Sequence, residues 1–152
     1  MSKIDLDMLK DQIQRAFADV ARPERESIVP HACDDCWRLR DALADCTVND
    51  LRADVLAPYC WDSALLSDQA KQYFLPAWFF ASFEKPDWDF ADAALIALDF
   101  DHRWSPERGY SSNQRAAICS YLKYLDVVGD EITRERVATA MAKWRGNCGA
   151  AD

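Results

Sequence analysis

The chain has 152 residues, half of them apolar and 29% charged, and its 26 acidic residues outnumber 18 basic ones to give a net charge of −8. This composition is typical of a folded domain and excludes a disordered tail or a fibrous repeat. The acidic balance argues against binding to nucleic acid, which requires a basic face, and against docking on an anionic membrane surface. We therefore expect neither nucleic acid nor membrane as a partner.

The N-terminal residues place acids, Asp5 and Asp7, where a signal peptide would need an uninterrupted apolar stretch. The longest apolar stretch, residues 73–83, is shorter than the roughly 18 residues that a membrane span requires. We therefore expect a cytosolic protein. Its six cysteines are accordingly expected to be free thiols or metal ligands rather than disulfides, with Cys119 packed in the core and Cys148 in a loose tail.

Apolar residues recur at helical spacing through the first part of the chain. A first helix is predicted to carry the residues from Leu6 to Val20 on one apolar face, with Ser2 as its N-cap and Pro23 stopping it soon after Val20. A second helix is predicted to start at Asp34 or Asp35, and a short third one to cover residues 49–56 and to end at Pro58. The apolar residues predicted to face inward are Leu6, Leu9, Ile13, Phe17, Val20, Cys36, Leu39, Leu43, Leu51, Val55 and Leu56.

Ser67 is predicted to cap a longer helix that reaches Ala81. Pro76 lies inside this segment and lacks a backbone N–H, which predicts a kink or a fresh start there. Another helix is predicted over residues 89–98. The inward residues of the capped helix are predicted to be Ala70, Phe74, Ala77, Trp78 and Ala81.

Residues 99–110 are expected to be irregular. The sequence Ser111-Ser112-Asn113-Gln114 matches a capping box and predicts a helix that runs to Val128 and ends at Gly129. A last helix is predicted to close at Gly146. The inward residues of these two helices are predicted to be Ile118, Tyr121, Leu122, Leu125, Val137, Met141 and Trp144.

No stretch alternates with the period of a strand, and no hairpin signal occurs. The prediction is therefore an all-α fold: a single compact domain of six or seven helices over residues 1–152, with a flexible tail from about residue 146.

The sharpest chemical feature is the sequence Pro30-His31-Ala32-Cys33-Asp34-Asp35-Cys36. A Cys-x-x-Cys pair at the start of a helix can direct both sulfurs at one ion, and a histidine two residues earlier supplies a third ligand. Structural zinc takes four nitrogen or sulfur ligands in a tetrahedron. We predict His31, Cys33, Cys36 and Cys60 as candidate ligands, with Cys46 or His102 as alternatives for the fourth position.

Three other interpretations of this motif stay open. A redox pair normally lies in a strand-to-helix context, which is not predicted here. A cysteine nucleophile could use His31 as its base, but the adjacent Asp34 and Asp35 disfavour a thiolate. Finally, Cys36 could pack inward while His31 and Cys33 merely line a loop.

Negative charge is concentrated in two stretches. Residues 34–62 carry a net charge of −4 and residues 84–101 a net charge of −5, whereas the rest of the chain sums to +1. Because charge steers encounter and buried aromatics supply affinity, this pattern is typical of a binder of a basic protein. The alternative is a set of solvated helix faces. The candidate partner-binding residues are Trp61, Asp62, Asp87, Trp88, Asp89, Asp92, Asp99 and Asp101.

Asp99, Asp101 and His102 lie close enough in sequence to form a metal or acid–base site. A hydrogen-bonded structural histidine is the other interpretation. With only two histidines in the chain, no Ser/His/Asp arrangement can be assembled with any specificity.

Two stretches together resemble an uncharacterised bacterial family of small helical proteins. The first is Ile28-Val29-Pro30-His31-Ala32-Cys33-Asp34-Asp35-Cys36. The second is Asp62-Ser63-Ala64-Leu65-Leu66-Ser67, continued by Tyr73-Phe74-Leu75-Pro76-Ala77. The resemblance implies that His31, Cys33 and Cys36 act as a unit, and it implies no particular reaction. The family is often rich in histidine just before the second stretch, where this chain has Cys60-Trp61.

These features predict a non-enzymatic cytosolic binding protein, most concretely an immunity-type inhibitor that covers the active site of a basic toxin or effector domain. The alternative is a zinc-stabilised helical protein, with a housekeeping or weak enzymatic role, centred on His31, Cys33 and Cys36.

Overall fold

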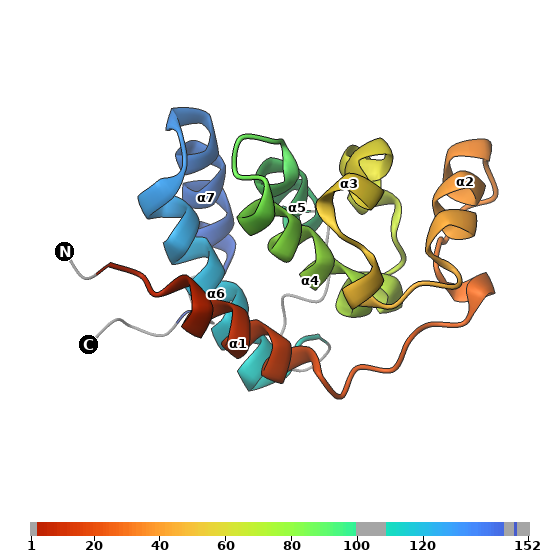
Figure 1. Ribbon diagram of the computed structural model, residues 1–152, viewed down its shortest axis with the longest axis horizontal. Coiled ribbons are helices and arrows are strands. Elements are labelled where there is room, and N and C mark those ends of the chain that lie inside the picture. Colours follow the sequence, from red (N-terminus) through yellow and green to blue (C-terminus); the bar gives the residue numbers. More distant parts are fainter. Residues whose placement is uncertain (1–2, 100–108, 145–147, 149–152) are drawn as a thin grey trace. The chain divides into compact units, whose positions relative to one another are not determined.

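The computed structural model describes residues 3–99, 109–144 and 148. Over these residues the chain forms seven α-helices, three 3₁₀ helices and no strand, which confirms the predicted all-α fold (Figure 1). The chain divides into two compact units: residues 1–19 together with residues 101–152, and residues 20–100. No helix in the described part of the chain is both long and apolar enough to cross a membrane.

Three helices build the first unit: α1 (Leu6–Phe17), α6 (Ser112–Val128) and α7 (Glu131–Trp144). α6 packs against both α1 and α7 (Figure 1). The predicted stripe on α6 is confirmed, since all four of its residues are buried. On α1 the buried residues are Leu9, Ile13 and Phe17.

Both ends of α1 differ from the prediction. Its N-cap is Asp5 rather than Ser2, because the Asp5 carboxylate accepts hydrogen bonds from the backbone N–H groups of Asp7, at 3.0 Å, and Met8, at 3.2 Å. The helix ends at Phe17, so Val20 lies beyond it.

The capping box that opens α6 is confirmed. The Ser111 hydroxyl accepts from the Gln114 N–H at 3.2 Å, and the Gln114 side chain accepts from the Ser111 N–H at 3.0 Å. Gly129 ends the helix as predicted. A Cβ at this position would lie 2.6 Å from the Leu125 carbonyl oxygen and 2.8 Å from Thr133 Cγ2, so the close approach of the next helix requires glycine.

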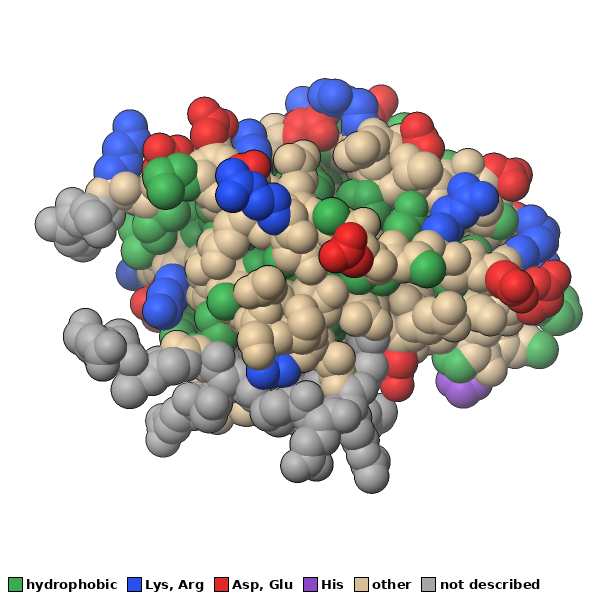
Figure 2. Space-filling view, turned by 90° about the horizontal axis from the view of Figure 1, so that it is seen from below, with side chains coloured by type: hydrophobic (Ala, Val, Ile, Leu, Met, Phe, Trp, Pro, Cys, Tyr) green, Lys and Arg blue, Asp and Glu red, His purple; other side chains and the backbone are tan. Residues whose placement is uncertain are grey.

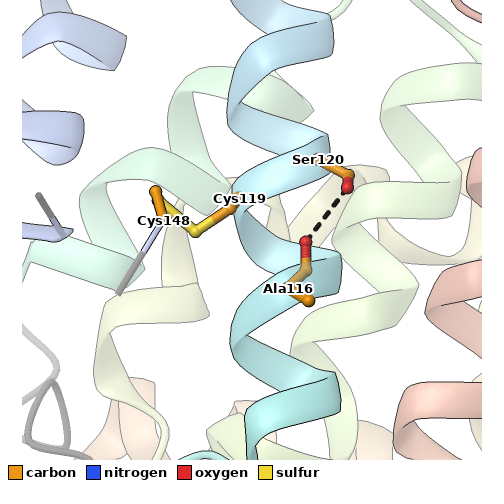
Figure 3. Close-up of a disulfide and its surroundings, with 4 residues drawn as sticks. All are labelled: Ala116, Cys119, Ser120 and Cys148. Atoms are coloured by element: carbon orange, nitrogen blue, oxygen red, sulfur yellow. Dashed lines mark hydrogen bonds between the residues drawn. A yellow bond between two sulfur atoms is a disulfide. The ribbon is translucent and has the colours of Figure 1, made fainter. Parts of the chain in front are cut away.

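A disulfide joins Cys119 on α6 to Cys148, and Figure 3 shows it beside the helix. Cys119 is buried, as predicted, but the expectation that these two cysteines are free thiols is wrong. The sequence could not reveal the pairing because 29 positions separate them. One turn of α6 next to the bond carries a further link, from the Ser120 hydroxyl to the Ala116 carbonyl at 3.0 Å (Figure 3). Of the predicted tail, the other residues from 146 onward lie outside the described residues, as does the predicted end at Gly146.

The second unit begins with the 3₁₀ helix η1 (Arg25–Ser27) and α2 (Asp34–Leu43), which starts where predicted. It continues through η2 (Val48–Asp50), α3 (Ala53–Leu56) and η3 (Ala57–Leu65) to α4 (Asp68–Glu84) and α5 (Phe90–Asp99). α5 packs against both α4 and η3, and α3 packs against α4. These contacts place η3 and the start of α5 side by side.

The segment from residue 48 to 65 departs most from the prediction. Two short helices, η2 and α3, replace the single helix predicted over residues 49–56. Asp50 accounts for the break, because its carboxylate accepts from the Thr47 N–H at 2.8 Å and thereby closes a capping box around η2 alone. Val55, predicted to face inward, is 45% exposed. Pro58 does not end the helical stretch but lies in the first turn of η3.

α4 supplies the core of this unit and runs through Pro76 as one helix, so the fresh start considered for this position does not occur. Ser67 caps it as predicted by accepting from the Ala70 N–H at 3.1 Å. Trp78 is fully buried, and its indole N–H donates to the Cys60 carbonyl oxygen at 2.9 Å. This hydrogen bond ties η3 to the centre of the core and fixes the residues on either side of Cys60.

Candidate functional site

The Cys-x-x-Cys motif lies at the N-terminus of α2. Cys33 is the N-cap residue, and its sulfur accepts from the Cys36 N–H at 3.4 Å. Cys33 is exposed, whereas Cys36 is fully buried beneath it. Burial first, and then a hydrogen bond with the Cys33 side chain, raise the pKa of Cys36 to about 11, although the backbone N–H of His31 acts in the opposite direction. The structure therefore places the side chains of Cys33 and Cys36 next to each other, and His31 contacts Cys36 through its backbone N–H.

Cys60, the predicted fourth ligand, lies in η3 among carboxylates. Burial raises its pKa to about 11, and the charges of Asp89, Asp62 and Asp92 add to that effect. Cys46, the alternative, donates its thiol hydrogen bond to the Ala42 carbonyl at 3.4 Å, and His102 lies outside the described residues. Across the described ranges, no three His, Cys, Asp or Glu side chains are grouped so that they could hold a metal ion. The zinc site stays a prediction.

Six of the predicted partner-binding residues lie on η3, on the segment that leads into α5 and in the first turn of α5. We call Trp61, Asp62, Asp87, Trp88, Asp89 and Asp92 the acidic face. Trp61 is 51% exposed and Trp88 is 44% exposed, so each presents a large part of its indole to solvent. The Ser63 hydroxyl donates to the Ala93 carbonyl at 2.9 Å, which holds η3 against α5 beside this face.

Asp62 lies partly buried within the acidic face. Burial raises its pKa, and the nearby charge of Asp35 adds to that effect while Arg38 opposes it. The Arg38 guanidinium lies 3.7 Å from Asp62 Oδ2, close enough for an ion pair but too far for a hydrogen bond. Asp62 Oδ2 is buried and accepts no hydrogen bond. A buried oxygen without a hydrogen bond costs stability.

The other two predicted residues are not part of this group. Asp99 is exposed at the last position of α5, about 15 Å along the helix axis from Asp89 at its start. Asp101 lies outside the described residues. Of the possible site formed by Asp99, Asp101 and His102, only Asp99 is among the described residues, so this site stays a prediction.

Sequence reasoning missed several neighbours of this surface. Trp37 follows the buried Cys36 on α2 and is 43% exposed. The Arg38 guanidinium lies over the Tyr59 ring at 5.4 Å, and the Lys85 ammonium lies over the Trp88 ring at the same distance. At the α2 end of the unit, Figure 2 shows acidic, basic and exposed hydrophobic side chains next to one another. The signal for Trp37 was available, since a residue one position after an inward cysteine on a helix must point about 100° away from it.

The first unit contains a hollow of about 750 Å³ between α1 and α6. Met8, which is 70% exposed, lines it together with charged residues such as Asp11, Arg15 and Lys123. No histidine or cysteine is among the described residues that line the hollow.

In comparisons with protein-family models, curated proteins and solved structures, none matches this chain. The resemblance to a bacterial helical family stays a prediction.

Proposed function

We propose that this chain is a binding protein without catalytic activity, and specifically an immunity-type inhibitor that covers a basic toxin or effector domain. The observation that carries this proposal is the acidic face, where the half-exposed indoles of Trp61 and Trp88 stand among four aspartates. Solvent-exposed tryptophan is costly, and tryptophan is enriched among the residues that dominate binding energy.

The negative charges of the acidic face indicate a partner with a basic surface. Asp62, Asp87, Asp89 and Asp92 place four negative charges around the two indoles, and Lys85 is the basic residue seen against Trp88. A partner with a basic patch would be attracted before contact, because complementary fields raise association rates well above those of neutral pairs. Toxin domains that act on nucleic acid need such a patch to bind phosphates, so an acidic face can cover their active site.

Lys85 also shows how a partner could dock. Its ammonium already occupies a cation position over the Trp88 ring at 5.4 Å. A lysine or arginine of the partner can take that position in its place, or the opposite ring face, and gain the same attraction in a desolvated interface. A basic partner thus uses an arrangement that the free protein forms with its own side chain.

Association kinetics test this proposal. The polypeptide that copurifies with the chain is bound to the triple variant Asp87→Asn/Asp89→Asn/Asp92→Asn at several salt concentrations. Asparagine suits this test because it preserves the capping ability of the residue that precedes α5. We expect the association rate at low salt to fall at least about tenfold, with a weaker salt dependence than the wild type.

A matched control variant, Asp19→Asn/Asp126→Asn/Glu135→Gln, also removes three negative charges, but at exposed sites of the first unit. Both triple variants change the net charge from −8 to −5. The proposal expects the control variant to associate within about twofold of the wild type, because local rather than total charge steers docking. Equal loss in both variants would contradict the assignment of the acidic face.

A further inference from the structure

The dithiol at the start of α2 has no part in the proposed binding function. Cys33 and Cys36 sit at the N-cap and at the third helical position of the same turn. Helix geometry puts Cα atoms three residues apart at about 5 Å, within the span that a disulfide bridges. The 3.4 Å contact between the Cys33 sulfur and the Cys36 N–H shows that the Cys33 side chain already turns towards its partner.

The two thiols differ in solvent exposure, and this difference determines which of them reacts first. Cys33 is exposed and can be reached by a small molecule, whereas Cys36 is fully buried and can be reached only by the sulfur above it. An exposed attacking thiol with a buried resolving thiol beside it is the arrangement that thiol–disulfide exchange needs. The other free cysteines, Cys46 and Cys60, are each half-buried.

We propose that Cys33 and Cys36 form a thiol–disulfide exchange site that is oxidised by low-molecular-weight disulfides. In the first step the Cys33 thiolate attacks one sulfur of the small disulfide, whose S–S bond breaks. A mixed disulfide on Cys33 forms, and the departing thiolate takes up the proton that Cys33 lost. In the second step Cys36, having lost its proton, attacks the Cys33 sulfur and releases the second small thiol. Two protein thiols are oxidised, and one small disulfide is reduced to two thiols.

Two local features act on the first step in opposite directions. The Cys36 N–H points at the Cys33 sulfur from the N-terminus of a ten-residue helix, which favours negative charge there. The carboxylates of Asp34 and Asp35, the next two residues, disfavour it.

The rest of the chain is consistent with oxidation. Cys119 and Cys148 are joined in the first unit, so the protein already contains one disulfide. Disulfides persist mainly in oxidising compartments. Conditions that keep this bond intact also favour oxidation of the pair on α2.

Peptide mapping tests the proposal because of where trypsin cuts. Cleavage after Arg25 and Arg38 releases residues 26–38, which contain Cys33, Cys36 and no other cysteine. The full chain is treated with oxidised glutathione under native conditions, quenched with acid and digested without reduction. We expect peptide 26–38 to be lighter by two hydrogen atoms and to carry no glutathione.

One comparison within the same sample and two variants serve as controls. The peptides that contain Cys46 and Cys60 should remain free or gain glutathione, because neither thiol has a partner cysteine on its own peptide. In the variant Cys36→Ser, Cys33 should retain its glutathione, since the resolving thiol is gone. In Cys33→Ser, modification of residues 26–38 should fall at least about tenfold, because a buried thiol reacts poorly.

Should Cys36→Ser fail to fold, the order of alkylation in the reduced wild type replaces it. Cys33 is then expected to react with iodoacetamide at least about ten times faster than Cys36. The proposal is overturned if peptide 26–38 keeps two free thiols in excess oxidised glutathione. A stable glutathione adduct on the wild-type peptide would overturn it equally.

Discussion

We expect the Cys119–Cys148 disulfide to contribute a large part of the stability of the first unit, and a single substitution can remove that part. Replacing Cys148 by alanine removes the bond but leaves Cys119 buried in α6. In the chain-entropy treatment of cross-links, a closed loop of 29 residues contributes about 3.5 kcal/mol to the free energy of unfolding. A loss of that size lowers the melting temperature of a domain this long by about 10 °C.

Guanidinium denaturation followed by far-UV circular dichroism measures this loss. Wild type and Cys148→Ala are compared with and without reductant. Reductant should lower the wild-type midpoint to that of Cys148→Ala and leave the variant nearly unchanged. Because both proteins retain Cys33 and Cys36, any contribution from that pair appears equally in both and cancels.

Two results would refute this reasoning. If oxidised wild type and Cys148→Ala unfold within about 1 kcal/mol of each other, the bond does not restrict the unfolded chain as the loop length requires. If the digest of the purified chain lacks a linked species of residues 116–123 and 146–152, the bond is absent in solution.

Four further outcomes follow from the structure. Asp50→Asn should destabilise the protein at neutral pH and make its stability depend less on pH in the acid range. The hydrogen bonds with Thr47 lower the pKa of Asp50, so its stabilisation is present above the unfolded pKa of about 4 and is lost as the pH falls through the folded pKa. Urea unfolding midpoints measured between about pH 7 and 3 check this. Asp62→Asn should raise the free energy of unfolding at neutral pH but weaken partner binding, because burial disfavours its charge; unchanged affinity would remove Asp62 from the site. Gly129→Ala should lower the thermal midpoint by several degrees, because its Cβ would lie 2.6 Å from a backbone oxygen, whereas an unchanged midpoint would mean that α7 moves freely. If the predicted zinc site at His31, Cys33 and Cys36 exists, a chelator should lower the melting temperature, because metal binding is coupled to folding; an unaltered melting temperature would contradict that prediction.

Local signals in the sequence predicted most of the helices. The Ser111 capping box, the Ser67 cap and the end at Gly129 each depend on residues within four positions of each other, and all three are confirmed. The region around Thr47 and Asp50 was missed although it is equally local. There, a side-chain hydrogen bond competed with helical periodicity and divided one predicted helix into two.

Long-range features could not be predicted in the same way. The partner of Cys119 lies 29 positions away, and nothing near either cysteine marks the pairing. The sequence singled out Trp61 and Trp88 through their acidic surroundings, but their exposure depends on how η3 packs against α5. The same holds for Cys60, whose backbone position is set by its hydrogen bond with Trp78 rather than by the Cys33 motif. The compartment also stays a prediction, and the disulfide is a feature more typical of oxidising surroundings.

Native mass spectrometry of the chain isolated from its own cells tests the proposed function most directly. We predict a stoichiometric complex with a basic polypeptide, retained by Asp19→Asn/Asp126→Asn/Glu135→Gln and lost in a Trp61→Ala/Trp88→Ala variant, where removal of two central aromatics costs at least about 100-fold in affinity. A complex that survives the loss of both indoles would contradict the acidic face as the binding site. Isolation of the chain without any bound polypeptide would contradict the proposal that the protein is an inhibitor.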